Sequence, residues 1–305
     1  MKKIEMVDLR GQYQKIQSKV NDSVLKTINS ASFINGPQVK SFQKHLEKYL
    51  GVKHVIPCAN GTDALQIALM ALDLKPGDEV ITPDFTYAST IEVILLLGLT
   101  PVLVDIDVDT FNIDVSGIKN AITSKTKAII PVHLFGQVAS MNEILEIAQE
   151  NDLYIIEDNA QSLGSNFTFK DGSKKKAGTI GHIGTTSFFP SKNLGAYGDG
   201  GAIFTEDDDL AHTLRGIVNH GMYVRYYHDL VGVNSRLDSI QASILDIKLD
   251  YLDDYNKSRC IAASKYNLRF KNQSKIITPI RVGEHDSHVF HQYTIRILNR
   301  NRDEL

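Results

Sequence analysis

Short apolar runs alternate with helical patterns along most of the chain. Between residues 54 and 156, apolar runs of four or five residues are separated by segments whose apolar side chains recur at helical spacing. Strands that are apolar throughout and separated by helices are typical of a mostly parallel sheet with helices on both faces. The pattern predicts strands at 54–57, 79–82, 101–104, 128–132 and 153–156, and helices beginning at Gly61 and spanning 86–97, 116 to about 123, and 141–150.

The two ends of the chain have a different pattern. Helices are expected at 13–30 and 39–50, and again at 207–218, and one long helix is expected to run from Asn234 to about Phe270. Asp171-Gly172 predicts a hairpin turn, and the lysines at 174–176 a solvated loop. Residues 219–233 are expected to be a Tyr- and His-rich loop without clear period, and 291–297 is expected to be a strand.

Composition narrows the class of protein. The 305 residues are 42% hydrophobic and 23% charged, which suits a soluble protein of two domains. The net charge of −3 argues against a nucleic-acid surface. Only Cys58 and Cys260 are present, so we expect neither disulfides nor a metal cluster, and a cytoplasmic location. Residues 1–10 lack the apolar core of a signal peptide, and residues 91–104 are too short to span a membrane.

Lys192 stands in an unusual segment. A β-type run at 185–189 ends at Pro190, and four glycines follow between 195 and 201. Glycines let backbone or ligand come close, and a lysine held at a strand end can lose its proton and form a Schiff base. The alternative is a surface lysine beside a glycine-rich turn, and this stretch alone does not decide between the two.

Two further sites are suggested by position. Gly61 and Thr62 open a helix, where free N–H groups and the helix dipole favour an anion; the alternative is that Thr62 or Asp63 merely caps the helix. Asp158 follows a strand, at the edge of the sheet where ligands bind in parallel sheets; the alternative is an ordinary turn residue. The Walker and GxGxxG patterns are absent.

An anion seat, an acid and a lysine together suit pyridoxal 5′-phosphate. The phosphate of this cofactor needs N–H groups and hydroxyls, its aldehyde needs a lysine, and its ring nitrogen needs a carboxylate that keeps it protonated. No metal site is expected.

Seven motifs, in order, resemble the nucleotide-sugar aminotransferase family (DegT/DnrJ type). The motifs are NGTDAL at 60–65, PDFTYAS at 83–89, EDNAQ at 157–161, SFFPSK at 187–192, GDGGA at 198–202, NSRLDSIQA at 234–242 and HQYTIR at 291–296. The resemblance covers residues 8–305. It implies an aspartate aminotransferase-like α/β fold of three layers, α/β/α, with a large cofactor domain at 1–250 and a small, apparently truncated C-terminal domain at 251–305.

The resemblance also implies roles for individual residues. Lys192 would form the Schiff base and shuttle a proton, Asp158 would pair with the ring nitrogen, Gln161 would donate to the ring oxygen, and Tyr87 would stack on the ring unless it is a core aromatic. The phosphate would be held by Gly61, Thr62 and Ser187.

Three more roles follow from the same resemblance. Asn234 would reach the phosphate of a neighbouring subunit, which implies a homodimer with shared sites. Arg236 would meet a carboxylate or diphosphate, with a helix-capping salt bridge as the alternative. His133 would support the site without touching substrate.

The implied reaction moves an amine from an amino acid, usually glutamate, to a keto group of a nucleotide-linked hexose. Within the family the chain most resembles enzymes acting on UDP-linked 3-keto sugars or sugar acids in surface-polysaccharide synthesis. The related dehydratases have histidine in place of Lys192.

Family members run some tens of residues further, and residues 302–305 resemble a helix start, so a truncated chain with impaired turnover is expected. The alternatives are a non-catalytic, ligand-sensing relative and an α/β binding protein without a cofactor.

Overall fold

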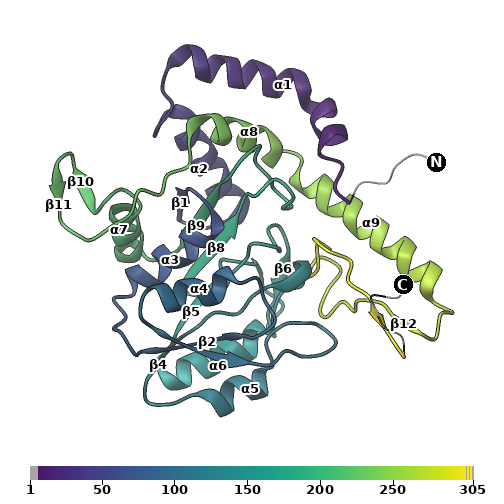
Figure 1. The fold of residues 1–305 in the computed structure, drawn as a ribbon. Coiled ribbons are helices and arrows are strands. Elements are labelled where there is room, and N and C mark those ends of the chain that lie inside the picture. The colour runs from purple at the N-terminus through teal and green to yellow at the C-terminus, as the bar shows by residue number, and fades with distance from the viewer. Residues whose placement is uncertain (1–5, 300, 302, 304–305) are drawn as a thin grey trace. The chain divides into compact units, whose positions relative to one another are not determined.

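The structure is a computed structural model that describes residues 6–299, 301 and 303. Seven strands form the main sheet, in the order β1-β9-β8-β5-β4-β2-β3 (Figure 1). The pairs β2–β3, β2–β4 and β4–β5 are parallel, and β1 is antiparallel to β9. This confirms the predicted α/β class with a mostly parallel sheet. The strands are β1 His54–Cys58, β2 Glu79–Pro83, β3 Thr100–Val104, β4 Thr126–Ile129, β5 Tyr154–Asp158, β8 Ile183–Ser187 and β9 Gly201–Thr205.

The contacts divide the chain into two compact units. Unit 1 holds residues 1–73 and 185–252, and unit 2 holds residues 74–184 and 253–305. Each unit combines two separate stretches of chain, so neither is a simple N- or C-terminal half. The domain boundary expected at residue 250 stays a prediction.

Unit 1 is built on helices that flank β1 and β9. Its helices are α1 Leu9–Ser30, α2 Pro37–Leu50, α3 Gly61–Ala71, α7 Asp208–Ile217 and α8 Ser239–Leu249. Helix α1 begins after Asp8, whose side chain accepts from the N–H of Gly11. It packs on α8 through Ile16, Val20 and Ile244 (Figure 1), so the apolar spacing of the first predicted helix is explained by burial against α8.

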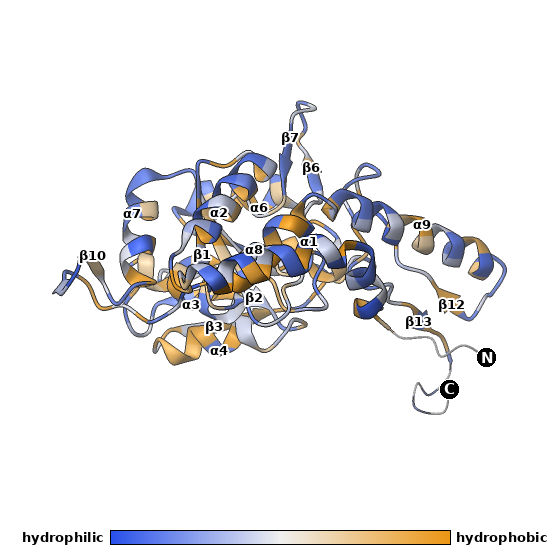
Figure 2. Ribbon diagram, turned by 90° about the horizontal axis from the view of Figure 1, so that it is seen from above, coloured by the Kyte–Doolittle hydropathy of each residue, from blue (hydrophilic) through white to orange (hydrophobic). Residues whose placement is uncertain are grey.

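Unit 2 carries the continuous βα run. Its other elements are α4 Ser89–Leu96, α5 Val115–Ala121, the short 3₁₀ helix η1 Leu134–Gly136, α6 Met141–Asn151, β6 Asn166–Thr168, β7 Lys174–Lys176, α9 Leu252–Phe270, which begins at the last residue of unit 1, β12 Ile276–Ile277 and β13 Arg296–Ile297. Ile81, Ile129 and Ile155 of three neighbouring strands pack with Ile144 of α6 in one core cluster. Figure 2 shows that α4 is mostly hydrophobic. No helix among the described residues is long and apolar enough to cross a membrane.

Several expectations about local structure are wrong. The lysines at 174–176 form strand β7, which pairs with β6 around a turn in which Gly172 has a φ of 83°; the predicted hairpin is confirmed, but the lysines are not a loop. Residues 219–233 contain a hairpin, β10 Met222–Val224 and β11 Tyr227–His228. The predicted helices and strands are otherwise displaced by a few residues: α1 begins at 9 and not at 13, α4 begins at 89, and β4 ends at 129.

The long helix expected from Asn234 to Phe270 is two helices. Helix α8 begins only at Ser239, after Asp238 accepts from the N–H of Gln241, and it ends at Leu249 before α9 begins. The strand expected at 291–297 is limited to Arg296–Ile297. Of the expected helix start at 302–305, residues 302, 304 and 305 lie outside the described residues.

Lys248 is buried in α8, with 1% of its surface exposed. Its Nζ donates to the carbonyl oxygen of Gly195 and lies 5.1 Å from the centre of the Tyr197 ring. Burial lowers the pKa of Lys248 to about 8, because a charged amine loses hydration there.

We expect Lys248→Met to remove a pH dependence of folding stability. Above pH 8 the native chain releases this proton, whereas the unfolded chain holds it up to the ordinary lysine value of 10.5. The wild-type free energy of unfolding therefore rises between these two values relative to the variant, by ~3 kcal/mol in total. Urea unfolding of both proteins from about pH 7 to about pH 10 measures this. A difference between the two that is independent of pH would contradict it.

Candidate active site

The anion seat predicted at the start of α3 falls on a helix start in unit 1. The side chain of Asn60 accepts from the N–H of Asp63 at 2.8 Å, so Asn60 caps the helix. The alternative that Thr62 or Asp63 is the cap is therefore wrong. The N–H groups of Gly61 and Thr62 belong to the first turn, where a helix offers them no internal partner, and they remain the natural place for an anion.

Ser187 lies directly against this seat. A Cβ added to Gly61 would lie 2.7 Å from the Cβ of Ser187, closer than side chains approach one another. Only glycine at 61 allows the helix start and the end of β8 to approach this closely. The structure thus brings together two of the three residues predicted to hold a phosphate, and Thr62 follows in the same turn.

The Asn-Ser-Arg motif at 234–236 is hydrogen-bonded to the backbone just before α3, in the same unit. The buried hydroxyl of Ser235 accepts from the N–H of Ala59 at 3.0 Å, one residue before the α3 cap. Asn234 on one side of it is exposed and Arg236 on the other is half-buried. Among the described residues Arg236 has no ion pair, and Asp238 caps α8, so the capping-salt-bridge alternative finds no support.

Lys192 lies in a tight loop that follows β8. It is five residues beyond the strand end at Ser187, so it is not itself at the strand end as expected. Its N–H donates to the carbonyl of Phe189 at 2.8 Å, which makes residues 189–192 a turn. Phe188 closes the loop, since its N–H donates to Gly200 and its carbonyl accepts from Ala196, both at 2.7 Å. The lysine side chain is half-buried.

Asp158 is the last residue of β5 and is 5% exposed. One carboxylate oxygen accepts from the hydroxyl of Thr90 at 3.0 Å and the other from the N–H of Ala160 at 3.1 Å. A buried, oriented carboxylate at a strand end differs from an ordinary turn residue. Thr90 was not predicted, because nothing in the sequence distinguishes it from other threonines on α4.

A second buried carboxylate stands beside Asp158. Glu157 accepts from the N–H groups of Gly178, Ile180 and Gly181 at 2.6–2.8 Å, and from His133 Nε2 at 2.8 Å. His133 Nδ1 accepts from the N–H of Ala139 at 3.2 Å, so the ring proton is on Nε2. Because His133 is completely buried, it has no face for substrate, in agreement with the supporting role expected for it.

Gln161 and Tyr87 complete the predicted residues of unit 2. Gln161 Oε1 accepts from the N–H of Phe135 at 2.7 Å. This bond orients the amide and directs its NH₂ group, a donor, away from Phe135. Phe135 has a φ of 57° and its ring contacts Phe85 and Phe111. Tyr87 is 72% exposed, so the alternative of a core aromatic is wrong.

The predicted residues thus form two groups, each arranged within one unit. Unit 1 carries the seat, the Lys192 loop and the Asn-Ser-Arg motif, and unit 2 carries Asp158, Gln161 and Tyr87. Their chemistry fits pyridoxal 5′-phosphate. The Gly61–Ser187 contact leaves amide and hydroxyl donors at a helix start, and Asp158 is a buried carboxylate that its neighbours hold in place.

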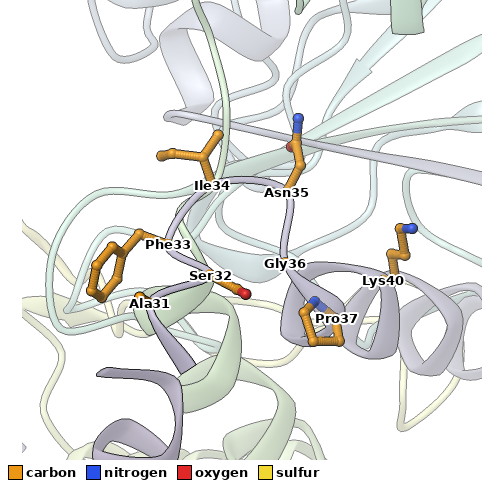
Figure 3. A pocket seen from close by; sticks show the side chains of 8 residues that line it. All are labelled: Ala31, Ser32, Phe33, Ile34, Asn35, Gly36, Pro37 and Lys40. Carbon is orange, nitrogen blue, oxygen red and sulfur yellow. The ribbon is translucent and has the colours of Figure 1, made fainter. Parts of the chain in front are cut away.

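An open pocket of about 550 Å³ lies elsewhere in unit 1, along residues 31–37 and Lys40 (Figure 3). Its loop is tied to the start of α8, because Ser239 donates to the carbonyl of Phe33 at 2.8 Å. Figure 3 shows the side chains of Phe33, Ile34 and Asn35 turned away from the loop backbone in different directions. The pocket contains none of the predicted site residues.

Comparison with protein families matches residues 14–305 to the DegT/DnrJ/EryC1/StrS aminotransferase family. The chain belongs to this family. A curated relative from Pseudomonas aeruginosa, UDP-2-acetamido-2-deoxy-3-oxo-D-glucuronate aminotransferase, is 46% identical over 97% of this chain and 81% of its own. A second, the pleiotropic regulatory protein of Geobacillus stearothermophilus, is 45% identical over 99% and 80%.

One solved structure bears on the cofactor. The NtdA protein of Bacillus subtilis, crystallised with bound PMP, is 32% identical to this chain, with a TM-score of 0.90, over 100% of this chain and 69% of its own. The DegT/DnrJ/EryC1/StrS family is dependent on pyridoxal phosphate, which agrees with the cofactor predicted from the sequence.

Gly61→Ala is expected to strain the seat and lower the free energy of unfolding by about 1–3 kcal/mol, as overpacking does. The added Cβ would meet the Cβ of Ser187 at 2.7 Å. Ser187→Gly removes that atom, so the double variant is expected to lose less stability than the sum of the two single variants. Thermal unfolding of the four proteins measures the coupling, and additive losses would show that the contact is not tight.

Proposed function

We propose that this chain transfers the amine of an amino acid, L-glutamate, to the keto group of a UDP-linked 3-keto hexose or hexuronic acid, in the synthesis of surface polysaccharide. The observation that carries the proposal is the seat of Gly61 and Ser187 in unit 1, with the Lys192 turn immediately after Ser187, in a chain of an aminotransferase family. The sugar is inferred from the activity that the name of the Pseudomonas relative states.

Several of the predicted site residues are proposed to hold the cofactor. The N–H groups of Gly61 and Thr62 and the hydroxyl of Ser187 would bind its phosphate, and Asp158 would hold a proton on its ring nitrogen. Gln161 would donate to the ring oxygen, and Tyr87 would cover a face of the ring. When bound, pyridoxal 5′-phosphate supplies an electron sink for the charge that develops when a proton leaves the amine-bearing carbon.

Lys192 would move the proton that leaves the amine-bearing carbon. A neutral amine can take a proton from carbon and return it to a neighbouring atom, which is general base and then general acid catalysis. Lys192 Nζ would take the proton from the donor carbon and, in the second half of the reaction, deliver one to the carbon of the sugar that receives the amine. Arg236, half-buried and without an ion pair among the described residues, would bind the acceptor's carboxylate or diphosphate.

We further propose a cytoplasmic homodimer with shared sites. The β10–β11 hairpin and the residues between it and Asn234 are rich in exposed apolar and aromatic side chains, with Tyr226 at 76%, Tyr227 at 68% and Val231 at 87% exposure. Figure 1 shows the hairpin standing out beyond α7 of the same unit. An exposed patch of this kind is typical of an interface. A second copy would cover it, and the exposed Asn234 would then reach the phosphate seat of that copy.

One observation favours a second function. The Geobacillus relative carries the name of a regulatory protein at 45% identity, which supports a ligand-sensing relative of the same fold. A sensor has no need of a lysine that reacts with the cofactor, and Lys192, Asp158 and Gln161 are all present here. We therefore place transamination first.

With added pyridoxal 5′-phosphate, the wild-type chain is expected to show the visible absorption band of a lysine-bound cofactor, and excess L-glutamate is expected to remove it. Lys192→Ala should lack the band, because no other amine is proposed to hold the aldehyde. Lys127→Ala, which changes an exposed lysine on β4, is the matched control and should keep it. A band that persists in Lys192→Ala, or does not respond to any amino acid, would contradict the transaminase proposal.

Shared sites can be tested by mixing two impaired variants. Lys192→Ala lacks the reactive amine and Asn234→Ala weakens the phosphate seat of its neighbour. Unfolding and refolding them together forms mixed dimers in which one site is intact, so activity should return to about a quarter of wild type for random pairing in a two-fold dimer. If Asn234 serves its own chain, the mixture stays no more active than its parts. Sedimentation of each variant confirms that a dimer forms.

A further inference from the structure

Helix α8 holds the loop that carries Lys192 at two points. Gln241 Oε1 accepts from the N–H of Tyr197 at 2.8 Å, and Lys248 Nζ donates to the carbonyl of Gly195. The two side chains are seven residues apart, which is two helical turns, so they share one face of α8. All of these residues belong to unit 1.

Gly195 packs directly against the turn that contains Lys192, so the hydrogen bond to its carbonyl also restrains that turn. A Cβ added to Gly195 would lie 2.2 Å from the carbonyl oxygen of Pro190 and 3.0 Å from that of Phe189. The backbone at 195 therefore rests on the backbone at 189–190, which begins the turn that ends at Lys192. If the carbonyl of Gly195 is released, that support is lost.

Packing alone does not require an amine at position 248. Methionine has nearly the same length and would fill the same space, and replacing a buried charge with an apolar residue is often neutral or stabilising. What the amine adds is a donor for one backbone carbonyl. The cost of its burial, which appears as its lowered pKa, is incurred for that bond and for its contact with the Tyr197 ring.

We propose that Lys248 is a positioning residue for Lys192, holding the Gly195 carbonyl so that the 189–192 turn presents the reactive amine in one orientation. This inference rests on the proposed function of Lys192, although its effect on the loop does not depend on the cofactor. Lys248 does not touch substrate or cofactor in this role.

The test compares Lys248→Met, which loses the donor, with Lys248→Arg, which keeps one. Ser243→Ala is the matched control, because Ser243 is also buried on α8 but bonds only to Ile240 of its own helix. In the cofactor-free chain, the rate at which a lysine-acylating reagent modifies Lys192 is measured by peptide mass spectrometry. With pyridoxal 5′-phosphate added, its affinity and the pH midpoint of the visible band are measured.

In the cofactor-free Lys248→Met chain we expect Lys192 to be acylated about fivefold faster. With cofactor added, we expect the affinity for pyridoxal 5′-phosphate to fall about tenfold and the pH midpoint of the visible band to shift, since small displacements of reactive groups are costly. Lys248→Arg should lie nearer wild type, and Ser243→Ala should equal it. An acylation rate and band midpoint unchanged in Lys248→Met would overturn the proposal. Should that variant not fold, Gln241→Ala, which removes the second hold, is measured in the same way.

The transaminase function and the positioning role of Lys248 can be rejected separately. If the wild-type chain forms no visible band through Lys192, the transaminase function fails, and the acylation rates still decide whether Lys248 positions the turn. If the wild-type band forms and responds to glutamate but Lys248→Met behaves as wild type, only the positioning role is rejected.

Discussion

The end of strand β5 depends on one fully buried carboxylate, that of Glu157. A buried charge is tolerated only when it is fully hydrogen-bonded, and Glu157 collects three backbone N–H groups from 178–181 and the imidazole of His133. Hydrogen bonds to a charged group contribute about 1.5–3 kcal/mol each. These bonds join β5 to the segment before β8. They therefore fix the backbone position of Asp158, the next residue, although none of the groups in the network is proposed to contact a ligand.

The regular part of the fold was predictable because each element carries its own signal. Continuous apolar runs mark strands that are buried on both faces, and Asp171-Gly172 marks its hairpin. The failures arise where distant contacts decide. Apolar spacing continues across Asp250, but α8 ends there. The lysines of β7 are a strand because they pair with 166–168, and Lys174 is neutralised by Glu284 and Asp286, more than a hundred residues away.

The sequence predicted which residues belong to the candidate site better than it predicted the contacts that orient them. Positions at strand ends and helix starts, with the family resemblance, pointed to Lys192, Asp158 and the seat. The partners that orient them did not stand out: Thr90 is an ordinary helical threonine, and Ser235 acts through a contact with Ala59 made 176 residues earlier in the chain. The alternative of a helix cap was placed on Thr62 or Asp63 and not on Asn60, because all three are good caps and only backbone geometry separates them.

The antiparallel pairing of β1 with β9 has a consequence for synthesis of the chain. Cys58 pairs with Gly201 and His54 with Thr205, so β1 leaves the ribosome with one edge that cannot be satisfied until the chain has grown by about 140 residues, which takes on the order of 10 s at common elongation rates. The intervening residues 74–184 belong to the other unit and can collapse during that delay. An unpaired apolar edge is open to non-native pairing, so the nascent chain is exposed to aggregation during this interval.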